Sequence, residues 1–332
     1  MISTGTDILS YSLSGAERRS FHALGADVAR RFDAVTGNGR APVDAVPAGL
    51  RAFLREFSLT PPRAGFALIR GIEIDALPPT PEARGYQLPL EHNTTGNLLL
   101  VADVLGSMTG YADEKDGALA HEVHPVRGEE ARIENTGSVN FGFHTENAHH
   151  PMRPDFLGLL CLRQDHDRVA VTRMSSIRDA VADLSAHTIS VLRGARFRAL
   201  YPTSFIRGES GERPSSRPHP VVFGEDPEYF MRFDLDNTYA LDDDGKIALE
   251  ELTTALDRNR REILLEPGDL AVINNNIAAH GRSAFTPRYD GDDRWLRRFY
   301  SLQSTPEWVR DIMPMPRVLP SLAEIDAADP DA

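Results

Sequence analysis

The stretch "NFGFHTENAHHPMRPDFLGLLCLR", residues 140–163, contains two β-type runs separated by a turn. Successive side chains of a strand point to opposite faces of a sheet. In the first run, this alternation places Phe143 on one face and His144 and Glu146 on the other. The second run, 156–163, is apolar and is typical of a short strand. The segment therefore predicts a β-rich core in which one strand carries an imidazole and a carboxylate side by side.

Similar β-type runs recur along the chain. They are "RVAVTRM", "EYFMRFDLD", "DLAVINNN" and "RWLRRFYSL", which start at residues 168, 228, 269 and 294. Apolar residues at helical spacing predict helices after a possible capping box at Ser14 and Glu17, and at about 50–57, 96–107, 176–195 and 248–262. Many short strands interrupted by helices favour a β-sandwich or jelly roll over a doubly wound sheet. The predicted fold class is mixed α+β, with a jelly-roll core and flanking helices.

We expect a single domain over residues 1–332. A helical scaffold would extend to about residue 110, and the jelly-roll core would follow from about 111 to 317. The polar stretch "IRGESGERPSSRPH", 206–219, predicts a long loop that is either a plain connection or a lid over a site. The tail, 320–332, is expected to be frayed.

Composition and charge exclude some classes of protein. No run of about eighteen apolar residues occurs, and the first residues lack the pattern of a signal peptide, so we expect a cytoplasmic protein without membrane association. Cys161 is the sole cysteine, and its apolar neighbours predict a buried thiol in a reducing compartment. A net charge of −13 argues against a nucleic-acid partner. It is compatible with a cationic substrate, although acidic surfaces usually serve solubility. The oligomeric state is not predicted.

His144 and Glu146 form two thirds of a facial triad of two histidines and one carboxylate, which leaves metal positions open for chemistry. A third ligand is available at His280, which follows the apolar run of "EPGDLAVINNNIAAHGRSAF". Each signal is weak alone, because a lone H-x-E pair or a histidine after a strand is usually structural. His149 and His150 come after the first run has ended, so we expect them to form the wall of a site rather than to bind the metal.

Two arginines strengthen the hypothesis of a site. The alternation of "RWLRRFYSL" places Arg294 and Arg298 on one face of an otherwise apolar strand. A buried guanidinium is costly without an anionic partner, and its planar fork matches a carboxylate. Two such guanidinium groups near a metal could bind the carboxylates of two acids, a cosubstrate and a substrate. The alternative is a pair of structural salt bridges with Asp292 or Asp293.

Taken together, these motifs resemble the clavaminate synthase-like iron(II)/2-oxoglutarate oxygenases, a family that includes hydroxylases of asparagine and arginine. The likeness extends from about residue 60 to 317. It is carried by "GSVNFGFHTENAHHPMRPDFLGLLCLR", "AVTRMSS", "MRFDLD" and "HGRSAF…RWLRRFY", in this order and at the spacing of the family. The resemblance implies a double-stranded β-helix fold, which agrees with the predicted jelly roll.

The resemblance also implies roles for residues of this chain. His144, Glu146 and His280 would hold Fe(II), while Arg294 and Thr172 would bind 2-oxoglutarate. The α-carboxylate of an amino-acid substrate would be held by Arg298. The implied reaction consumes O2 and 2-oxoglutarate, releases succinate and carbon dioxide, and hydroxylates an unactivated carbon.

Further residues concern the substrate. We interpret Asp234 and Asp236, in "FMRFDLDN", as a sensor for a basic side chain, because two aspartates on one strand face repel each other unless a cation lies between them. The alternatives are an exposed acidic strand face or a bridge to Arg232. Glu122 is a candidate for the substrate ammonium group.

Ser138 and Asn140 are expected to face the pocket. The predicted function is β-hydroxylation of a free basic L-amino acid, arginine or an arginine-like one first. The alternatives are a same-fold oxygenase for a neutral or carrier-tethered amino acid, by hydroxylation or desaturation, and a non-catalytic metal-binding jelly roll.

Overall fold

The predicted β-type runs assemble into two facing sheets. The computed structural model describes residues 8–37, 40–134, 136–206 and 213–329. The larger sheet has the order β1-β2-β14-β7-β16-β3, with β5 also paired to β16. Its strands are β1 (Leu9–Ser12), β2 (Phe66–Arg70), β14 (Leu270–Asn274), β7 (Phe156–Arg163), β16 (Trp295–Leu302), β3 (Ser107–Met108) and β5 (Ala120–Val123).

The smaller sheet has the order β13-β8-β15-β6 and carries most of the metal-type residues. Its strands are β13 (Arg261–Ile263), β8 (Thr172–Ser176), β15 (Ala278–Arg282) and β6 (Phe141–His144). Leu68 and Leu157 of the larger sheet and Met174 and Ala278 of the smaller one belong to the same buried apolar cluster. The two sheets therefore pack face to face around a shared core, as a jelly roll requires.

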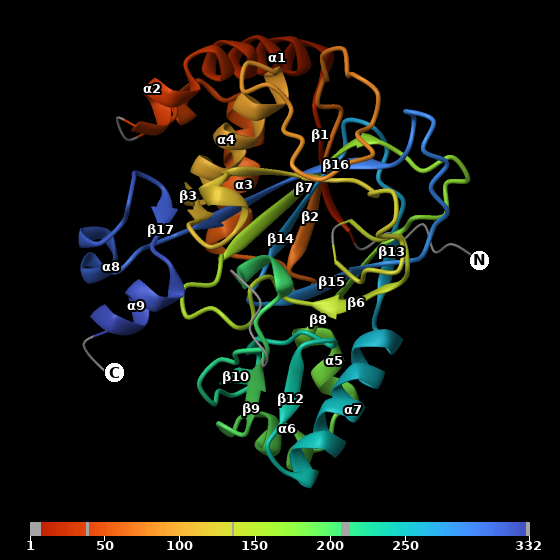
Figure 1. Ribbon diagram of the computed structural model, residues 1–332, viewed down its shortest axis with the longest axis vertical. Helices are drawn as coiled ribbons and strands as arrows, with labels where there is room; N and C mark the ends of the chain where they lie inside the picture. Colours follow the sequence, from red (N-terminus) through yellow and green to blue (C-terminus); the bar gives the residue numbers. More distant parts are fainter. Residues whose placement is uncertain (1–7, 38–39, 135, 207–212, 330–332) are drawn as a thin grey trace.

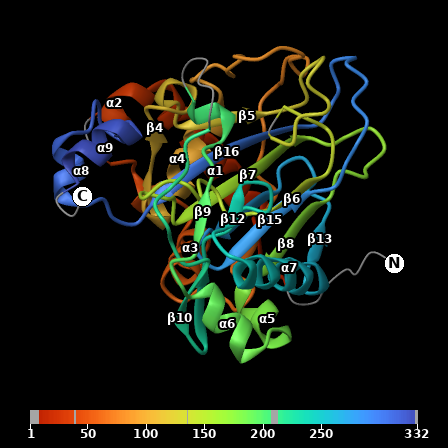
Figure 2. The same cartoon turned by 60° about the horizontal axis from the view of Figure 1, so that its bottom comes forward.

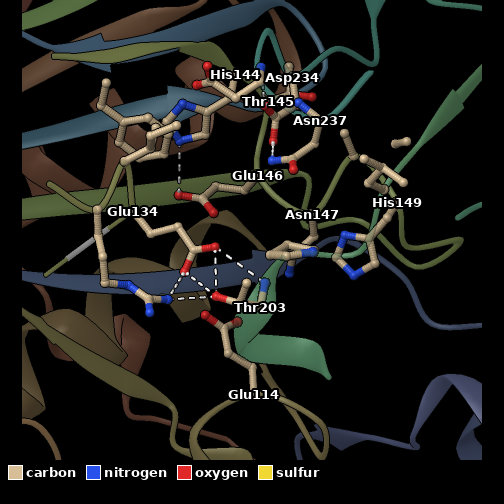
Figure 3. A pocket seen from close by; sticks show the side chains of 18 of the residues that line it. Glu114, Glu134, His144, Thr145, Glu146, Asn147, His149, Thr203, Asp234 and Asn237 are labelled. Atoms are coloured by element: carbon tan, nitrogen blue, oxygen red, sulfur yellow. Dashed lines mark hydrogen bonds and ion pairs between the residues drawn. The ribbon is translucent and has the colours of Figure 1, made fainter. Parts of the chain in front are cut away.

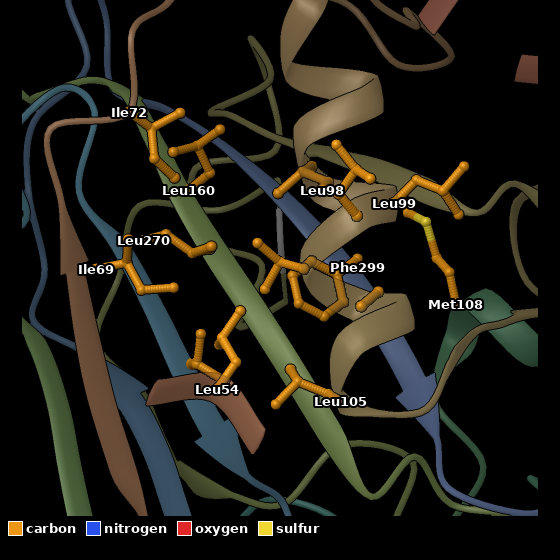
Figure 4. Packing of buried hydrophobic residues seen from close by; sticks show 14 of the residues in the cluster. Leu54, Ile69, Ile72, Leu98, Leu99, Leu105, Met108, Leu160, Leu270 and Phe299 are labelled. Atoms are coloured by element: carbon orange, nitrogen blue, oxygen red, sulfur yellow. The ribbon is translucent and has the colours of Figure 1, made fainter. Parts of the chain in front are cut away.

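Helices cover the other face of the larger sheet (Figure 1). They are α1 (Gly15–Arg30), α3 (Ala48–Leu59) and α4 (Asn93–Leu105). Figure 4 shows Leu98 and Leu105 of α4 packed beside Leu160 and Phe299 of the sheet, which belong to a second buried cluster. Neighbouring strand residues such as Leu159 and Leu160 belong to different clusters, because successive side chains point to opposite faces of the sheet. The larger sheet therefore separates the core shared with the smaller sheet from the core under the helices.

Helix packing is closest between α1 and α4. The predicted capping box at Ser14 is confirmed, since its side chain accepts a hydrogen bond from Glu17 N and the Glu17 carboxylate accepts one from Ser14 N. A side chain at Gly96 of α4 would meet the carbonyl oxygen of Gly25 at 2.0 Å. Only glycine therefore allows this approach of the two helices.

A separate layer lies below the smaller sheet in Figure 1 and comes forward in Figure 2. It comprises α5 (Ile177–Ala180), η3 (Val181–Asp183), α6 (Ala186–Leu192), β9 (Phe197–Ala199), β10 (Val222–Glu225), β11 (Glu228–Met231), β12 (Thr238–Ala240) and α7 (Asp243–Arg258). The single helix predicted over 176–195 is in fact interrupted. Ser185 caps a new helix by accepting a hydrogen bond from Thr188 N, so the chain restarts at α6.

The C-terminal part is more ordered than predicted. The expectation of a frayed tail is wrong for α9 (Leu322–Ala328), because Ser321 and Glu324 form a capping box and Leu322 and Ile325 are buried. The remaining short elements are α2 (Phe32–Gly37), η1 (Val43–Ala45), β4 (Gly110–Tyr111), η2 (Lys115–Gly117), η4 (Thr203–Phe205), α8 (Glu307–Asp311) and β17 (Val318–Leu319).

The predicted loop 206–219 lies partly outside the described residues, which exclude 207–212. Its second part runs beside β9, where Ser216 N donates to Ala199 O and His219 N donates to Phe197 O. Cys161 is buried in the shared core, as expected. Among the described helices, none combines the length and the apolar character needed to cross a bilayer.

Candidate functional site

His144, Glu146 and His280 come together at one point between the two sheets. His144 and His280 lie directly opposite each other on the antiparallel strands β6 and β15. Their Nε2 atoms are 3.9 Å and 3.5 Å from Oε1 of Glu146. All three side chains are buried, and one ligand atom of each lies within 4.8 Å of the other two. The strand pairing thus joins residues that are far apart in the sequence.

Hydrogen bonds of the His144 ring and of Asn275, a residue not singled out from the sequence, fix the geometry around this cluster. The His144 ring donates from Nδ1 to the Gly142 carbonyl at 3.0 Å, which leaves its Nε2 free to accept. The fully buried Asn275 accepts a hydrogen bond from Glu146 N at 2.7 Å and donates to Glu146 O at 3.1 Å. The expectation that Glu146 shares a strand with His144 is wrong, because β6 ends at His144, and this amide fixes the chain just beyond that end.

The donor set of the cluster fits a divalent iron. Two imidazole nitrogens and one carboxylate on the same side form the facial arrangement typical of non-haem Fe(II) sites. The pKa of Glu146 is held well below its usual range, because the attraction of Arg298 and the two histidines outweighs the effect of burial. The carboxylate is therefore ionised, as a metal ligand must be.

A narrow cavity adjoins the cluster. Thr172 and Arg294 line it together with His144, His280 and Arg282. Among the described residues, the buried Arg294 guanidinium forms neither an ion pair nor a hydrogen bond. Its burial lowers its pKa, because the charged form is poorly solvated there. A buried, uncompensated guanidinium next to a threonine hydroxyl is suited to an anionic ligand.

The alternative partners of Arg294 are engaged elsewhere. Asp292 lies 3.7 Å from Arg163, and the Asp293 carboxylate accepts hydrogen bonds from the backbone N–H groups of Arg288 and Tyr289. Asp293 also lies near His166 and Asp290, which form a second group of metal-type residues nearer the surface. The structural salt bridges considered for Arg294 are therefore not formed.

Arg298 connects the cluster to a carboxylate that the sequence analysis did not single out. Its guanidinium donates to Glu146 Oε1 at 2.8 Å and to Glu114 Oε1 at 3.0 Å. Tyr300 also donates to Glu146, at 3.1 Å. Burial raises the pKa of Glu114 against the opposing effect of Arg298. Glu114 lies between β4 and η2, outside any recognisable motif, so it could not be identified from the sequence.

A larger cavity of about 360 Å³ opens beside the cluster (Figure 3). His144, Glu146 and Arg298 line it on one side. Its remaining acidic residues are Glu114, Glu134, Asp234 and Asp236, and its remaining arginines are Arg132 and Arg213. In Figure 3, Asp234 and Asn237 lie at one end of the cavity and Glu114, Glu134 and Thr203 at the other, with Glu146 between them.

Asp234 and Asp236 both reach this cavity, but not from a strand. The prediction of a strand over 228–236 is wrong beyond Met231, where β11 ends. Asp234 Oδ1 accepts hydrogen bonds from Asp236 N at 2.9 Å and from Asn237 N at 3.1 Å, so it caps a turn. Thr145 N and Oγ1 both donate to Phe233 O, which ties this turn to the end of β6 beside His144.

The two aspartates lack a cationic partner. Among the described residues, neither Asp234 nor Asp236 forms an ion pair, and Arg213 instead donates to the Asn237 side chain at 2.8 Å. Asp236 is an exposed residue, and the partial burial of its carboxylate, followed by repulsion from Asp234, raises its pKa. The considered bridge to Arg232 is also absent, since Arg232 donates to Ala148 O.

The expectation that Glu122 binds a substrate is wrong. Its carboxylate accepts hydrogen bonds from Trp295 Nε1 at 2.7 Å and lies 2.9 Å from Arg297 Nε, outside the cavity that contains His144. In β5 the neighbouring residue, His121, points to the cluster side, where Arg298 Nη2 lies 3.1 Å from its Nδ1. Adjacent side chains of a strand point to opposite faces, so His121 faces the cluster and Glu122 faces away from it.

Arg297 makes a testable contribution to stability. It is fully buried and also donates to the hydroxyls of Thr94 and Thr95 at 2.8 and 2.9 Å. We expect Arg297→Ala to lower the free energy of unfolding by about 3–5 kcal/mol, because the buried Glu122 carboxylate loses its cationic partner. Urea unfolding measures this loss, and Arg297→Met combined with Glu122→Leu should recover most of it. A loss below about 1 kcal/mol in the single variant would contradict a strong buried pair.

The remaining predicted residues are placed as follows. Ser138 and Asn140 do not line either cavity: Ser138 O accepts from Phe285 N, and Asn140 accepts from Arg173 at 2.7 Å. The expectation that they face the pocket is therefore wrong. His149 lines the larger cavity and packs on Phe205, while His150 accepts a hydrogen bond from Met152 N. Neither histidine joins the cluster, in agreement with the prediction.

Comparisons with known proteins show the family to which this chain belongs. A family model described as "Taurine catabolism dioxygenase TauD, TfdA family" matches residues 62–300. L-asparagine oxygenase of Streptomyces coelicolor is 39% identical over 258 residues, which cover 77% of this chain and 76% of the relative. These matches confirm the resemblance found in the sequence.

Solved structures of related enzymes confirm the jelly-roll class. Asparagine oxygenase in complex with Fe(II), 2S,3S-3-hydroxyasparagine and succinate gives a TM-score of 0.87 at 33% identity, covering 94% of this chain and 99% of that one. The non-heme iron oxygenase OrfP, in complex with Fe, succinate and (3S)-hydroxy-L-Arg, gives a TM-score of 0.79 at 29% identity, covering 93% and 99%.

Proposed function

Since the chain belongs to the TauD/TfdA dioxygenase family and is an Fe(II)- and 2-oxoglutarate-dependent amino-acid hydroxylase, we propose that it hydroxylates the β-carbon of a free basic L-amino acid. Arginine or an arginine-like amino acid is the first candidate. We further propose that His144, Glu146 and His280 hold the iron. When bound, iron and 2-oxoglutarate activate O2 for attack on an unactivated C–H bond, with succinate and carbon dioxide as coproducts.

In this proposal, the narrow cavity takes the cosubstrate. Arg294 holds a carboxylate of 2-oxoglutarate in bidentate fashion, and the Thr172 hydroxyl donates to the same group. Leu159 and Leu296 form apolar parts of the cavity wall, which reduce the access of water to the bound cosubstrate. The support is a guanidinium that is buried, lacks an acidic partner among the described residues, and lies next to the cluster.

The larger cavity takes the amino acid. Arg298 binds the α-carboxylate, and Glu114 accepts a hydrogen bond from the α-ammonium group, because these two groups pair at the same end of the cavity. The side chain then extends past Glu146 towards Asp234 and Asp236. Both head groups of the substrate are charged, so their fixed partners orient the β-carbon towards the cluster.

The observation that carries the substrate class is the pair of uncompensated carboxylates, Asp234 and Asp236. Partial burial, followed by the repulsion between the two carboxylates, raises the pKa of Asp236. A guanidinium or ammonium group between them removes the repulsion. The position of reaction is supported by the OrfP complex, whose ligand is an arginine hydroxylated at carbon 3.

L-asparagine is the second candidate substrate, favoured by the 39% identity to L-asparagine oxygenase. Its side-chain amide would also offer N–H groups to Asp234. The two candidates differ in what Asp236 does, since a neutral amide does not need a second carboxylate. The carboxylate of Asp236 interacts with the Gly142 backbone but does not cap the turn, which Asp234 does.

The test is a panel of free amino acids incubated with Fe(II), 2-oxoglutarate and O2, with the gain of one oxygen atom measured by mass spectrometry. We expect arginine, ornithine or lysine to react and asparagine to react poorly. Asp236→Asn should lower kcat/KM for the basic substrate by about 10–100-fold, the effect of losing a charge-assisted hydrogen bond. Asp243→Asn, on the exposed start of α7, is the control and should change nothing.

Turnover of asparagine alone would overturn the interpretation of the two aspartates and favour the second candidate. The same conclusion follows if Asp236→Asn leaves the kinetics of a basic substrate unchanged.

A further inference from the structure

Beside the cavity of about 360 Å³ that is proposed to take the amino acid lies another of about 400 Å³, which we name the second cavity. Arg132, Glu134 and Thr203 line both cavities. Since these three residues also contact one another, they form the boundary between the two spaces. Figure 3 shows Glu134 and Thr203 joined by hydrogen bonds at the Glu114 end of the cavity proposed to take the amino acid.

The boundary is a small hydrogen-bonded network between two segments. Thr203, at the start of η4, donates to Glu134 Oε1 from its hydroxyl at 3.1 Å and from its N–H at 3.3 Å. Arg132 donates to the Thr203 hydroxyl at 2.6 Å and to Glu134 Oε2 at 3.3 Å. These bonds are largely exposed, so each contributes little and the network can be opened by one substitution.

The second cavity adjoins the end of the substrate pocket that holds the head groups. Lys115, Asp116 and Ala118 line it, and they follow Glu114 directly in the chain. The aspartates at 234 and 236 do not line it. A group attached to the α-nitrogen, beside Glu114, would therefore extend into this cavity, whereas a longer side chain would not.

We propose that Glu134, held by Arg132 and Thr203, is a specificity-determining residue that restricts the enzyme to amino acids with a free α-amino group. The inference rests on the proposed function, in which Glu114 binds this group. The closed network leaves no passage for an acyl group on the α-nitrogen. When the network is opened, the second cavity accepts such a group.

The experiment compares a free basic amino acid with its Nα-acetyl derivative. For each variant we measure the ratio of kcat/KM for the acetylated form to that for the free form. Glu134→Ala also removes a negative charge from the end of the cavity that would bind the ammonium group. Glu134→Gln, which removes this charge but keeps the size of the side chain, therefore serves as the reference that separates the charge from the passage. We expect Glu134→Ala to raise this ratio at least about tenfold over the unmodified enzyme, and Thr203→Val to raise it less.

Glu130→Gln is the matched control, because Glu130 belongs to the same segment but accepts from Tyr289 and lines neither cavity. An unchanged ratio in both Glu134→Ala and Thr203→Val would overturn the inference, as would an equal rise in Glu130→Gln.

A binding measurement separates this inference from the proposed function. The shift in the thermal unfolding midpoint caused by the acetylated amino acid needs no turnover, and we expect it to grow in Glu134→Ala. If no variant oxidises any amino acid, the proposed function fails. The binding comparison then still decides the inference, since an unchanged shift contradicts it.

Discussion

We expect replacement of His144 by alanine to abolish iron binding and to lower succinate formation at least about 1000-fold, which corresponds to about 4 kcal/mol of lost transition-state stabilisation. The expected cause is the loss of one of three protein ligands that converge within 4.8 Å. Glu146→Ala and His280→Ala should behave in the same way. Because the remaining two ligands cannot hold the metal in a facial geometry, the reaction has no centre on which to proceed.

Two measurements check this result. Equilibrium binding of Fe(II) under anaerobic conditions reports the metal, and the release of succinate from 2-oxoglutarate reports the reaction. His166→Ala serves as the control, since His166 belongs to the other group of metal-type residues, with Asp290 and Asp293. Iron binding that survives in His144→Ala but fails in His166→Ala would show that the wrong group was assigned.

We expect replacement of Arg294 by alanine to raise the KM for 2-oxoglutarate by roughly 30–1000-fold, the effect of removing a buried charged partner worth about 2–4 kcal/mol. The KM for the amino acid should change much less, because Arg294 lines the narrow cavity and Arg298 lines both. Steady-state kinetics with each substrate varied in turn separates the two effects. If Arg294→Ala weakens only the amino acid, the roles of the two arginines are reversed.

Stability supplies the control for this variant. A buried guanidinium without an acidic partner costs free energy in the ligand-free protein. We therefore expect Arg294→Met to leave the thermal midpoint of the ligand-free enzyme unchanged or higher, while the midpoint no longer rises when 2-oxoglutarate is added. A lower midpoint without ligand would instead indicate that Arg294 stabilises the fold.

The parts of the site that lie on strands could be predicted from the sequence. Alternation along β6 selects His144, and alternation along β16 separates Arg294 and Arg298 from Arg297. Both patterns are local and need only the period of two. The jelly-roll class followed from the same runs, since each buried strand is short and strongly apolar.

The incorrect predictions concern residues whose position depends on a contact with a distant segment or on a local hydrogen bond. Glu122 is opposite Arg297 in the register of β5 and β16, and this pairing captures its carboxylate. The pairing register of distant strands is not readable from a single sequence. Likewise, the strand expected at Asp234 ends earlier, because its side chain caps a turn instead of continuing the alternation.

Glu114 was missed for a third reason. It lies in an irregular segment, where neither periodicity nor a motif marks it, and its role depends on contact with Arg298 at 3.0 Å. Asn275, which fixes the backbone of Glu146 by two hydrogen bonds, was passed over as one of three consecutive asparagines. Residues that act through contacts between distant segments become visible only in the folded chain.

The central claim is that one cluster holds iron, with 2-oxoglutarate on one side and a basic amino acid on the other. Anaerobic visible spectroscopy tests it most directly. Addition of Fe(II) and 2-oxoglutarate together should produce a weak charge-transfer band that neither gives alone, and L-arginine should perturb this band. The absence of any band at saturating iron and cosubstrate, or a band that survives in His144→Ala, would contradict the account.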